Sequence, residues 1–465
     1  MQLDTFIEEL GDIPHTTDVA RVRAKSRDMS GYLSPILKMD EEGKFADILV
    51  TPRNREDVFA IARSAARSRM PLICRGAGTC TFGQGIPLAG GAIIDMTEIS
   101  RILWLKDRAI RAEPGVRMLN ADRAAQEKVG AEMRIHPSTR RAATLGGFVG
   151  GGHVGIGSCR YGILRDRGNI LAAQVISVEE QPRIVELRGA EVNRVHHAYG
   201  TNGIILELEM PLAPAYPWLE AIVSFKDFMA ASRFALTLSQ SDGIITKLVS
   251  VYSWPYQQWL KPLARYFRER EHTVHLMVAA DYPDVLDWIV AESDGTVVYR
   301  GLEGQGDFGA PLYEFSFGHA ALHARKVVPN LVENLGLIPA HDLLGTIERV
   351  YRKFGHLGPF QYDVKRIDGT LTCQGAPTFP FIDTAHVRKV IEGMENEGVR
   401  FANVHTLHVR ENGIKTVDAS EIAFKRLMDP HGLMNPGKLS ADELTAQNRG
   451  EGAALPTSGW RRAQQ

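Results

Sequence analysis

Cysteine is scarce in this chain: four residues in 465, with no Cys-x-x-Cys pair. This usage excludes an iron–sulfur cluster or a disulfide framework and indicates a reducing compartment. An excess of either charge is also lacking, because 54 Lys and Arg stand against 55 Asp and Glu, which argues against a nucleic-acid or anionic-membrane surface. No apolar run is long enough to span a bilayer, and no signal peptide is apparent. We therefore expect a cytoplasmic protein.

Glycine, by contrast, is abundant in two places, and the first is the segment from Pro71 to Met96. It reads as a strand, a glycine-rich turn opened by Arg75, and a second strand. Glycines 76, 78, 83 and 85 let the backbone turn sharply and approach a ligand closely. Consecutive backbone N–H groups in such a turn hold phosphate oxygens. The alternative is an ordinary glycine-rich hairpin.

The second glycine-rich segment runs from His136 to Gly162. It contains a formal G-x-G-x-x-G match at residues 150, 152 and 155, but no apolar strand precedes the match, as a nicotinamide-binding fingerprint requires. A flat ligand lying against bare backbone would explain this composition. A flexible loop would also explain it, although long loops inside a compact domain are usually functional.

Six segments in order resemble the FAD-binding enzymes of the vanillyl-alcohol oxidase / para-cresol methylhydroxylase superfamily. The last of them, DPHGLMNPGKL, is similar to an ending of the D-lactate dehydrogenase / glycolate oxidase branch. The resemblance covers residues 45–215 and 425–440 and is poor between them. The matching segments are 46–58, 75–88, 136–149, 159–166, 199–212 and 429–439.

The resemblance implies FAD as cofactor, with Asn435 and Lys438 near the ribityl chain or the pyrimidine edge of the flavin. A lysine there would stabilise a reduced, anionic ring. The residues expected to bind FAD are Arg75, Gly76, Ala77, Gly78, Thr79, Cys80, Gly83, Pro137, Ser138, Thr144, Gly146, Gly147, Arg160, Tyr161, Gly162, Gly203, Ile204, Asn435 and Lys438.

The periodicities predict an α+β protein. Short apolar runs alternate with a helical pattern at residues 55–70, giving a β-α-β unit before the first glycine-rich turn. A proline-containing break at 212–218 marks a boundary. The resemblance implies a two-subdomain FAD-binding domain of the vanillyl-alcohol oxidase type, which we place at 1–215. It also implies an α+β cap domain with an antiparallel sheet, at 216–424, and a return to the first domain at 425–465.

The cap is expected to supply the catalytic side chains. A hydroxylated substrate needs a base for its hydroxyl proton, and a carboxylate substrate favours a bidentate arginine. His405 is the first candidate for the base, and Arg366 for the anion anchor. His323 and Tyr362 are the further candidates. As a strand, residues 361–369 would place Tyr362 and Arg366 on one face, away from Lys365, although a surface cross-strand pair is the alternative.

No metal is expected. Some relatives in the hydroxy-acid branch use the motifs HxGDGNxH and EHG, and this chain has neither. His319 and His323 would share a helix face, whereas His405 and His408 on a strand would point to opposite faces. Covalent flavin is not expected either, because Thr79 stands where linked relatives carry histidine. A link through His405 stays open.

The predicted function is FAD-dependent oxidation of an alcohol or 2-hydroxy acid, with hydride passing to flavin N5. Two alternatives remain open: an NADPH-dependent reductase of the UDP-N-acetylenolpyruvylglucosamine type, and a catalytically silent FAD-binding partner subunit. The expected partners are a small-molecule substrate and an electron acceptor, which would be oxygen, a quinone or a redox protein. A homodimer is a further expectation, whereas nucleic acid and a transmembrane segment are not.

Overall fold

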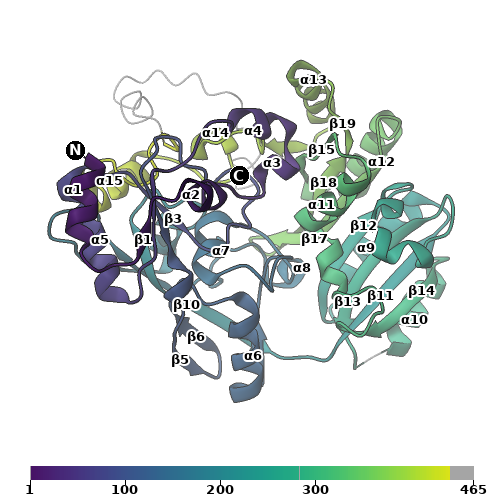
Figure 1. The fold of residues 1–465 in the computed structure, drawn as a ribbon. Coiled ribbons are helices and arrows are strands. Elements are labelled where there is room, and N and C mark those ends of the chain that lie inside the picture. The colour runs from purple at the N-terminus through teal and green to yellow at the C-terminus, as the bar shows by residue number, and fades with distance from the viewer. Residues whose placement is uncertain (1, 282, 440–465) are drawn as a thin grey trace.

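The computed structural model describes residues 2–281 and 283–439 and divides into two lobes (Figure 1). Two sheets form the left-hand lobe in that view, and one large sheet forms the right-hand lobe. Both kinds of structure expected from the sequence, helices and antiparallel sheets, are present, so the α+β prediction is confirmed.

The first sheet has four strands in the order β1-β2-β4-β3, namely β1 (His15–Thr16), β2 (Ile48–Val50), β4 (Ala92–Asp95) and β3 (Leu72–Arg75). β4 runs parallel to β2 and β3. Helix α5 (Arg55–Ser68) connects β2 to β3 and packs with α1 (Gln2–Leu10) on the apolar core of this sheet. The glycine-rich turn therefore leaves the carboxyl end of a parallel strand, where α/β units bind ligands.

The second sheet is antiparallel. Its order is β5-β6-β10-β8-β9, with β7 paired to β10. The strands are β5 (Ile102–Lys106), β6 (Ala109–Ala112), β7 (Ala131–Met133), β8 (Ala172–Ile176), β9 (Ile184–Arg188) and β10 (Ile204–Pro214). Helix α6 (Met118–Val129) packs on it, and the second glycine-rich segment forms the short helices α7 (Leu145–Gly151) and α8 (Ser158–Tyr161).

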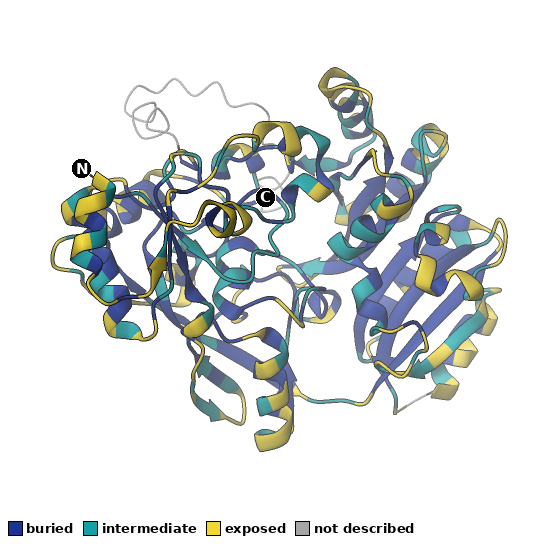
Figure 2. Ribbon diagram, in the orientation of Figure 1, coloured by how far each residue is buried: buried dark blue, intermediate teal, exposed yellow. Residues whose placement is uncertain are grey.

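The third sheet has eight antiparallel strands in the order β14-β11-β13-β12-β17-β18-β16-β20. These are β11 (Trp218–Phe225), β12 (Thr246–Tyr252), β13 (His272–Ala279), β14 (Thr296–Leu302), β16 (Leu335–Ile338), β17 (Phe360–Ile367), β18 (Thr370–Pro377) and β20 (Arg400–Ala402). One face packs on helices α9 (Phe228–Gln240), α10 (Pro283–Glu292), α12 (Leu343–Phe354) and α13 (Thr384–Glu395). The inner strands are buried, whereas the edge strand β14 and the outer helix faces are partly exposed (Figure 2).

The opposite face of this sheet contacts the other lobe through α8, which packs on β12 and β17. Figure 1 shows α7 and α8 between the lobes. Helix α11 (Phe317–Val327) and the two-stranded pair β15 (Leu331–Val332) and β19 (Phe379–Pro380) complete this region. This face of the third sheet therefore lies against the second glycine-rich segment.

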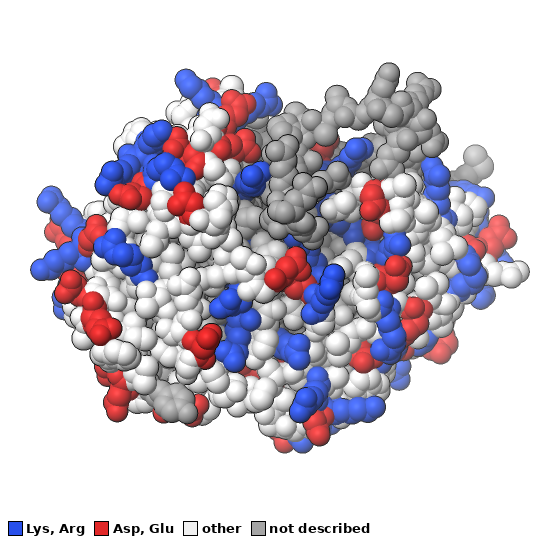
Figure 3. All heavy atoms as spheres, turned by 180° about the vertical axis from the view of Figure 1, so that it is seen from behind, with Lys and Arg blue, Asp and Glu red and all other residues white. Residues whose placement is uncertain are grey.

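After α14 (Val409–Asn412) and α15 (Ala419–Met428), the chain runs beside β3, where Leu72 pairs in parallel with Met434. The backbone N–H of Leu72 donates to Leu433, and that of Asn435 donates to Leu72. The domain bounds given above stay a prediction, and 440–465 lies outside the described residues. No helix in the described ranges is long and apolar enough to cross a membrane. Basic and acidic side chains are interspersed on the face in Figure 3.

Candidate active site

The two glycine-rich segments meet at Gly76 and Thr144, and glycine is required at this and other close contacts. A Cβ atom at Gly76 would lie 2.1 Å from Thr144 Oγ1, and one at Gly146 would lie 2.4 Å from Pro114 Cβ. Gly78 adopts a φ of +71°, which residues with a side chain rarely adopt. Thr144 in turn begins α7, where its hydroxyl accepts from the backbone N–H of Gly147 at 3.3 Å. The local sequence therefore builds a cradle of bare backbone.

Arg75 supplies the cation of this cradle. Its Nη1 donates to the carbonyl of Arg27 at 2.6 Å, while its buried Nε has no hydrogen-bond partner among the described residues. Burial lowers the pKa of Arg75 from its usual value, and Asp28 acts in the opposite direction. An unsatisfied guanidinium N–H beside open backbone suits a phosphate group. The residues present thus fit the pyrophosphate of FAD.

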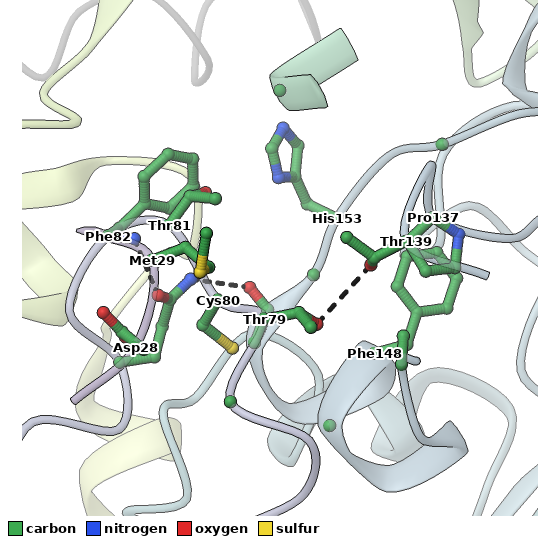
Figure 4. A pocket seen from close by; sticks show the side chains of 18 of the residues that line it. Asp28, Met29, Thr79, Cys80, Thr81, Phe82, Pro137, Thr139, Phe148 and His153 are labelled. Carbon is green, nitrogen blue, oxygen red and sulfur yellow. Dashed lines mark hydrogen bonds between the residues drawn. The ribbon is translucent and has the colours of Figure 1, made fainter. Parts of the chain in front are cut away.

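A cavity of about 510 Å³ extends from this cradle to the third sheet. In Figure 4, Thr79 and Thr139 point toward one another from the two glycine-rich segments, with hydroxyl oxygens 3.5 Å apart. Twelve residues of the FAD prediction line the cavity. They are Arg75, Gly76, Ala77, Gly78, Thr79, Cys80, Pro137, Ser138, Thr144, Gly146, Gly147 and Gly203.

Asn435 and Lys438 do not line the cavity but contact the first glycine-rich turn, and their expected place near the flavin edge stays a prediction. Asn435 Nδ2 donates to the carbonyls of Gln84 and Tyr199 at 2.9 and 2.7 Å, and Lys438 Nζ donates to that of Gly83 at 2.6 Å. Burial lowers the pKa of Lys438 to about 7. The cause is the pairing of Leu72 with Met434, which brings this segment under the glycine-rich turn. The hydrogen bonds of both residues hold the first glycine-rich turn in place.

The other five predicted FAD ligands also lie outside the cavity wall. Gly83 belongs to the fastened turn, where a Cβ would lie 2.2 Å from Leu407 Cδ2. Ile204 is buried in the core, and its neighbour Ile205 lines the cavity instead. Arg160, Tyr161 and Gly162 lie in and directly after α8, which packs on the third sheet.

His405 does line the cavity, as expected for a base in the cap. It lies in a loop and not on a strand. Its Nδ1 is 2.8 Å from Ser34 Oγ, and its Nε2 is 3.1 Å from Asn334 Oδ1. Burial lowers the pKa of His405 to about 4. His408 lies apart from it, with Nδ1 2.8 Å from the carbonyl of Gly437.

Tyr362 and Arg366 share a face of β17, as the alternation predicts, but this face points away from the cavity. Tyr362 is fully buried in the core, with its ring edge against Phe228. Arg366 donates to the carbonyls of Cys159 and Ser239, each at 3.1 Å. Neither residue lines the cavity, because Tyr362 packs in the core beneath helix α9 and Arg366 bridges carbonyls of α8 and α9. Their catalytic roles stay predictions.

His323 does not line the cavity either, whereas His319, on the same helix, does. The His323 ring stacks on Phe315 with centroids 4.7 Å apart, and burial lowers its pKa to about 4. Among the described residues, no group of three or more His, Cys, Asp or Glu side chains could hold a metal ion.

The residues missed by the sequence analysis lie on the other face of β17 and on its neighbour. Gln361, Asp363 and Gln374 line the cavity. Asp363 accepts from Ser250 Oγ and from Gln361 Nε2, the latter at 2.9 Å, and burial raises its pKa to about 6. The alternation signal was present, but it does not say which face packs on the helices.

His153, from the second glycine-rich segment, also lines the cavity (Figure 4). Burial lowers its pKa well below the usual value. Like Asp363, it is a buried titratable group at a cavity wall, which is the environment in which perturbed pKa values mark functional sites.

Comparison with known proteins agrees with this geometry. The FAD binding domain family model matches residues 46–187. The glycolate oxidase subunit GlcD of Bacillus subtilis (strain 168) is 21% identical over 432 residues, which cover 85% of this chain and 89% of that protein. A D-lactate dehydrogenase of Anaerostipes hadrus is 28% identical over 181 residues, covering 36% and 37% of the two chains.

Solved structures of alkyldihydroxyacetonephosphate synthase show the same fold. One has a TM-score of 0.69 at 16% identity and covers 93% of this chain and 84% of its own. The resemblance in the sequence, the cradle and these comparisons agree. The chain is an FAD-dependent oxidoreductase with an FAD binding domain, and its relatives and its fold fit the vanillyl-alcohol oxidase / para-cresol methylhydroxylase superfamily.

Proposed function

We propose that this protein oxidises the hydroxyl-bearing carbon of a small molecule, an alcohol or a 2-hydroxy acid. The observation that carries the proposal is a cavity that joins the cofactor cradle to polar residues of β17 and β18. When bound, FAD supplies the acceptor that takes hydride at N5. Relatives named as a glycolate oxidase subunit and a D-lactate dehydrogenase support a hydroxyl-bearing donor.

The chain must then take the hydroxyl proton of the substrate. Asp363 is our first choice, because it lies in the cavity wall and its pKa of about 6 leaves it ionised near neutral pH, close to the optimum for a base. Its three neighbours Ser250, Gln361 and the backbone N–H of Phe317 orient the carboxylate. His405 is the second choice, since both of its ring nitrogens already have partners.

The electron acceptor is proposed as oxygen, a quinone or a redox protein, and a cytoplasmic location is proposed from the four free cysteines. A homodimer is also proposed. The alignment with the D-lactate dehydrogenase covers 37% of that protein, so its activity as a whole is not assigned to this chain.

The test begins with purified holoprotein, from which acid or heat should release intact FAD. Anaerobic stopped-flow reduction with hydroxy acids and alcohols then identifies donors. Asp363→Asn should slow flavin reduction by about 10²–10⁴-fold, the usual contribution of a positioned base. Asp368→Asn is the matched control, because Asp368 is exposed on the same hairpin and asparagine tolerates its φ of +48°. Colourless protein that cannot be reconstituted, or no reduction by any hydroxylated donor, would contradict the proposal.

A further inference from the structure

A fully buried lysine, Lys365, lies on the same strand as Asp363. Side chains two positions apart on a strand share a face, so Gln361, Asp363 and Lys365 project from the same side of β17. The first two line the cavity, whereas Lys365 does not. Only about 6.6 Å of strand separates Lys365 from Asp363. The lysine can therefore act on the cavity only through its neighbours.

Gln374 is one of these neighbours, and Lys365 binds it directly. Gln374 lines the cavity and stands opposite Asp363 in the pairing of β17 with β18. Lys365 Nζ donates to Gln374 Oε1. Because an ammonium group has donors and no acceptor, this bond directs the oxygen end of the amide toward the lysine. Lys365 thus fixes the side chain that stands across the ladder from the proposed base.

The charge of a buried ammonium group requires a compensating negative charge. The titratable and charged groups that act on Lys365 come from four neighbouring segments: Asp363 on β17, Cys373 on β18, Arg165 and Asp166 shortly after α8, and His153 after α7. Two of them are carboxylates. Asp166 Oδ2 accepts from the backbone N–H groups of Ile163 and Asp368, each at 3.0 Å, and Asp363 is the carboxylate that lines the cavity.

The reciprocal effect falls on Asp363. Burial raises the pKa of Asp363 to about 6, whereas its hydrogen bonds and the charge of Lys365 act in the opposite direction. Burial and Arg165 lower the pKa of Lys365 to about 7, against the effect of Asp363. The ammonium group is thus still present at the pH at which Asp363 titrates. An opposite charge close to a carboxyl group favours its ionised form.

Other titratable groups also act on or with Asp363, and all of them are acids: Glu333, Tyr252, Tyr256 and Cys373. An acid is neutral or negative, so none of these groups stabilises a negative charge on Asp363 by attraction. The positive charge on this face of the strand comes from Lys365.

We infer that Lys365 is a positioning residue for the oxidation: its ammonium group, bonded to Gln374 and on the strand face of Asp363, holds Asp363 in the ionised form. This inference rests on the proposed function, in which Asp363 is the base. The hydroxyl proton of the substrate passes to the Asp363 carboxylate as hydride leaves the same carbon for the flavin. Lys365 keeps its own proton throughout.

Two substitutions separate the charge of Lys365 from its hydrogen bond. Lys365→Met removes both, whereas Lys365→Gln removes the charge and keeps an N–H donor for Gln374. The second variant carries the test if the first does not fold. Lys247→Met is the matched control, because Lys247 is a buried lysine on the neighbouring strand β12, lies 3.1 Å from Glu132 and does not line the cavity.

The first measurement does not depend on turnover. Holoenzyme labelled with carbon-13 at the aspartate carboxyl carbon is titrated by NMR, and the signal of Asp363 is identified by its absence from Asp363→Asn. We expect a midpoint near 6 in the wild type. The midpoint should be at least about one pH unit higher in both Lys365 variants, and it should be unchanged in Lys247→Met.

The second measurement is the pH profile of anaerobic flavin reduction, with a donor that reduces the wild type. Both Lys365 variants should be about fivefold slower near pH 6 and within about twofold of the wild type near pH 9, because only the fraction of ionised Asp363 has changed. A lysine that merely supported the fold would slow the reaction at every pH. Asp363→Asn combined with Lys365→Met should be no slower than Asp363→Asn alone, because the lysine acts through Asp363.

The outcomes separate the inference from the proposed function. If the carboxyl midpoint stays near 6 in the Lys365 variants, the inference is refuted, whether or not a donor is found. If the midpoint rises but no hydroxylated compound reduces the flavin, the effect of Lys365 on Asp363 stands and the proposed reaction fails. If the midpoint rises while the pH profile of reduction does not move, Asp363 is not the base, so the positioning role is refuted and the oxidation stands.

Discussion

The close approach of Gly76 to Thr144 in the cofactor cradle allows a test in which a second substitution should rescue the first. A Cβ atom at Gly76 would lie 2.1 Å from Thr144 Oγ1 but 3.4 Å from Thr144 Cβ. Gly76→Ala therefore collides with one oxygen atom, and Thr144→Ala removes that atom. We expect Gly76→Ala to lower FAD affinity, and the double variant to recover most of the loss.

The magnitudes follow from the contacts. Overpacking costs about 1–3 kcal/mol, which corresponds to about a 5- to 150-fold rise in the dissociation constant of FAD if the strain falls on the cradle. Thr144→Ala alone loses the hydrogen bond that begins α7, at a cost of about 0.5–2 kcal/mol. Because the collision needs both residues, the double variant should cost little more than Thr144→Ala, giving a coupling free energy of about 1–3 kcal/mol.

The assay is titration of FAD into apoprotein, followed by quenching of flavin fluorescence, for the wild type, both single variants and the double variant. Gly243→Ala is the control, because a Cβ there meets no atom within 4 Å. Losses that simply add, with coupling below about 0.5 kcal/mol, would show that Gly76 and Thr144 are not in contact and would refute the cradle.

Three further outcomes are expected. Gly78→Val places a branched side chain at a φ of +71°, so the FAD content of the purified protein should fall sharply although the chain still folds. If the variant keeps stoichiometric FAD, the turn is an ordinary hairpin and not a phosphate-binding turn. If Asp363 is the base, flavin reduction should rise with pH through about 6, its pKa, because only the ionised carboxylate accepts the proton; a rate that stays flat down to about pH 5 would favour His405, whose pKa is about 4. Glu132→Gln removes the partner of buried Lys247, 3.1 Å away across the lobes, and should lower the melting temperature by several degrees through a loss of about 3–5 kcal/mol; an unchanged melting temperature would contradict this.

The cofactor half of the site could be predicted from the sequence because its chemistry is local. A strand, a glycine turn and an arginine stand together between Pro71 and Met96, and backbone geometry forces glycine at Gly76 and Gly78. Such constraints act within a few residues, so a sequence motif records them. Asn435 and Lys438 are different, because they act through carbonyls of a turn some 350 positions earlier in the chain, and the motif records only that they matter near the turn.

The substrate half could not be predicted in the same way. Alternation along β17 correctly pairs Tyr362 with Arg366 and, on the other face, Gln361 with Asp363, but the choice of face depends on where α9 packs. Helix α9 lies more than 100 positions before β17 in the chain, so the local pattern does not show where it packs. Tyr362 is a candidate from the sequence because of its phenol, but its ring is buried in the core. A buried aromatic side chain more often packs in the hydrophobic core than takes part in catalysis.

The hydrogen-bonded residues around His405 also come together only in the folded chain. Ser34, Asn334 and His405 come from three separate segments, with separations of 371 and 71 positions between the bonded pairs. No spacing rule connects them, and each alone is an ordinary polar residue. Once the fold brings them together, their hydrogen bonds use both nitrogens of His405 and leave the buried Asn334 Nδ2 without a hydrogen-bond partner among the described residues. The sequence singles out His405 as a base, but only the fold shows that both of its ring nitrogens already have hydrogen-bond partners.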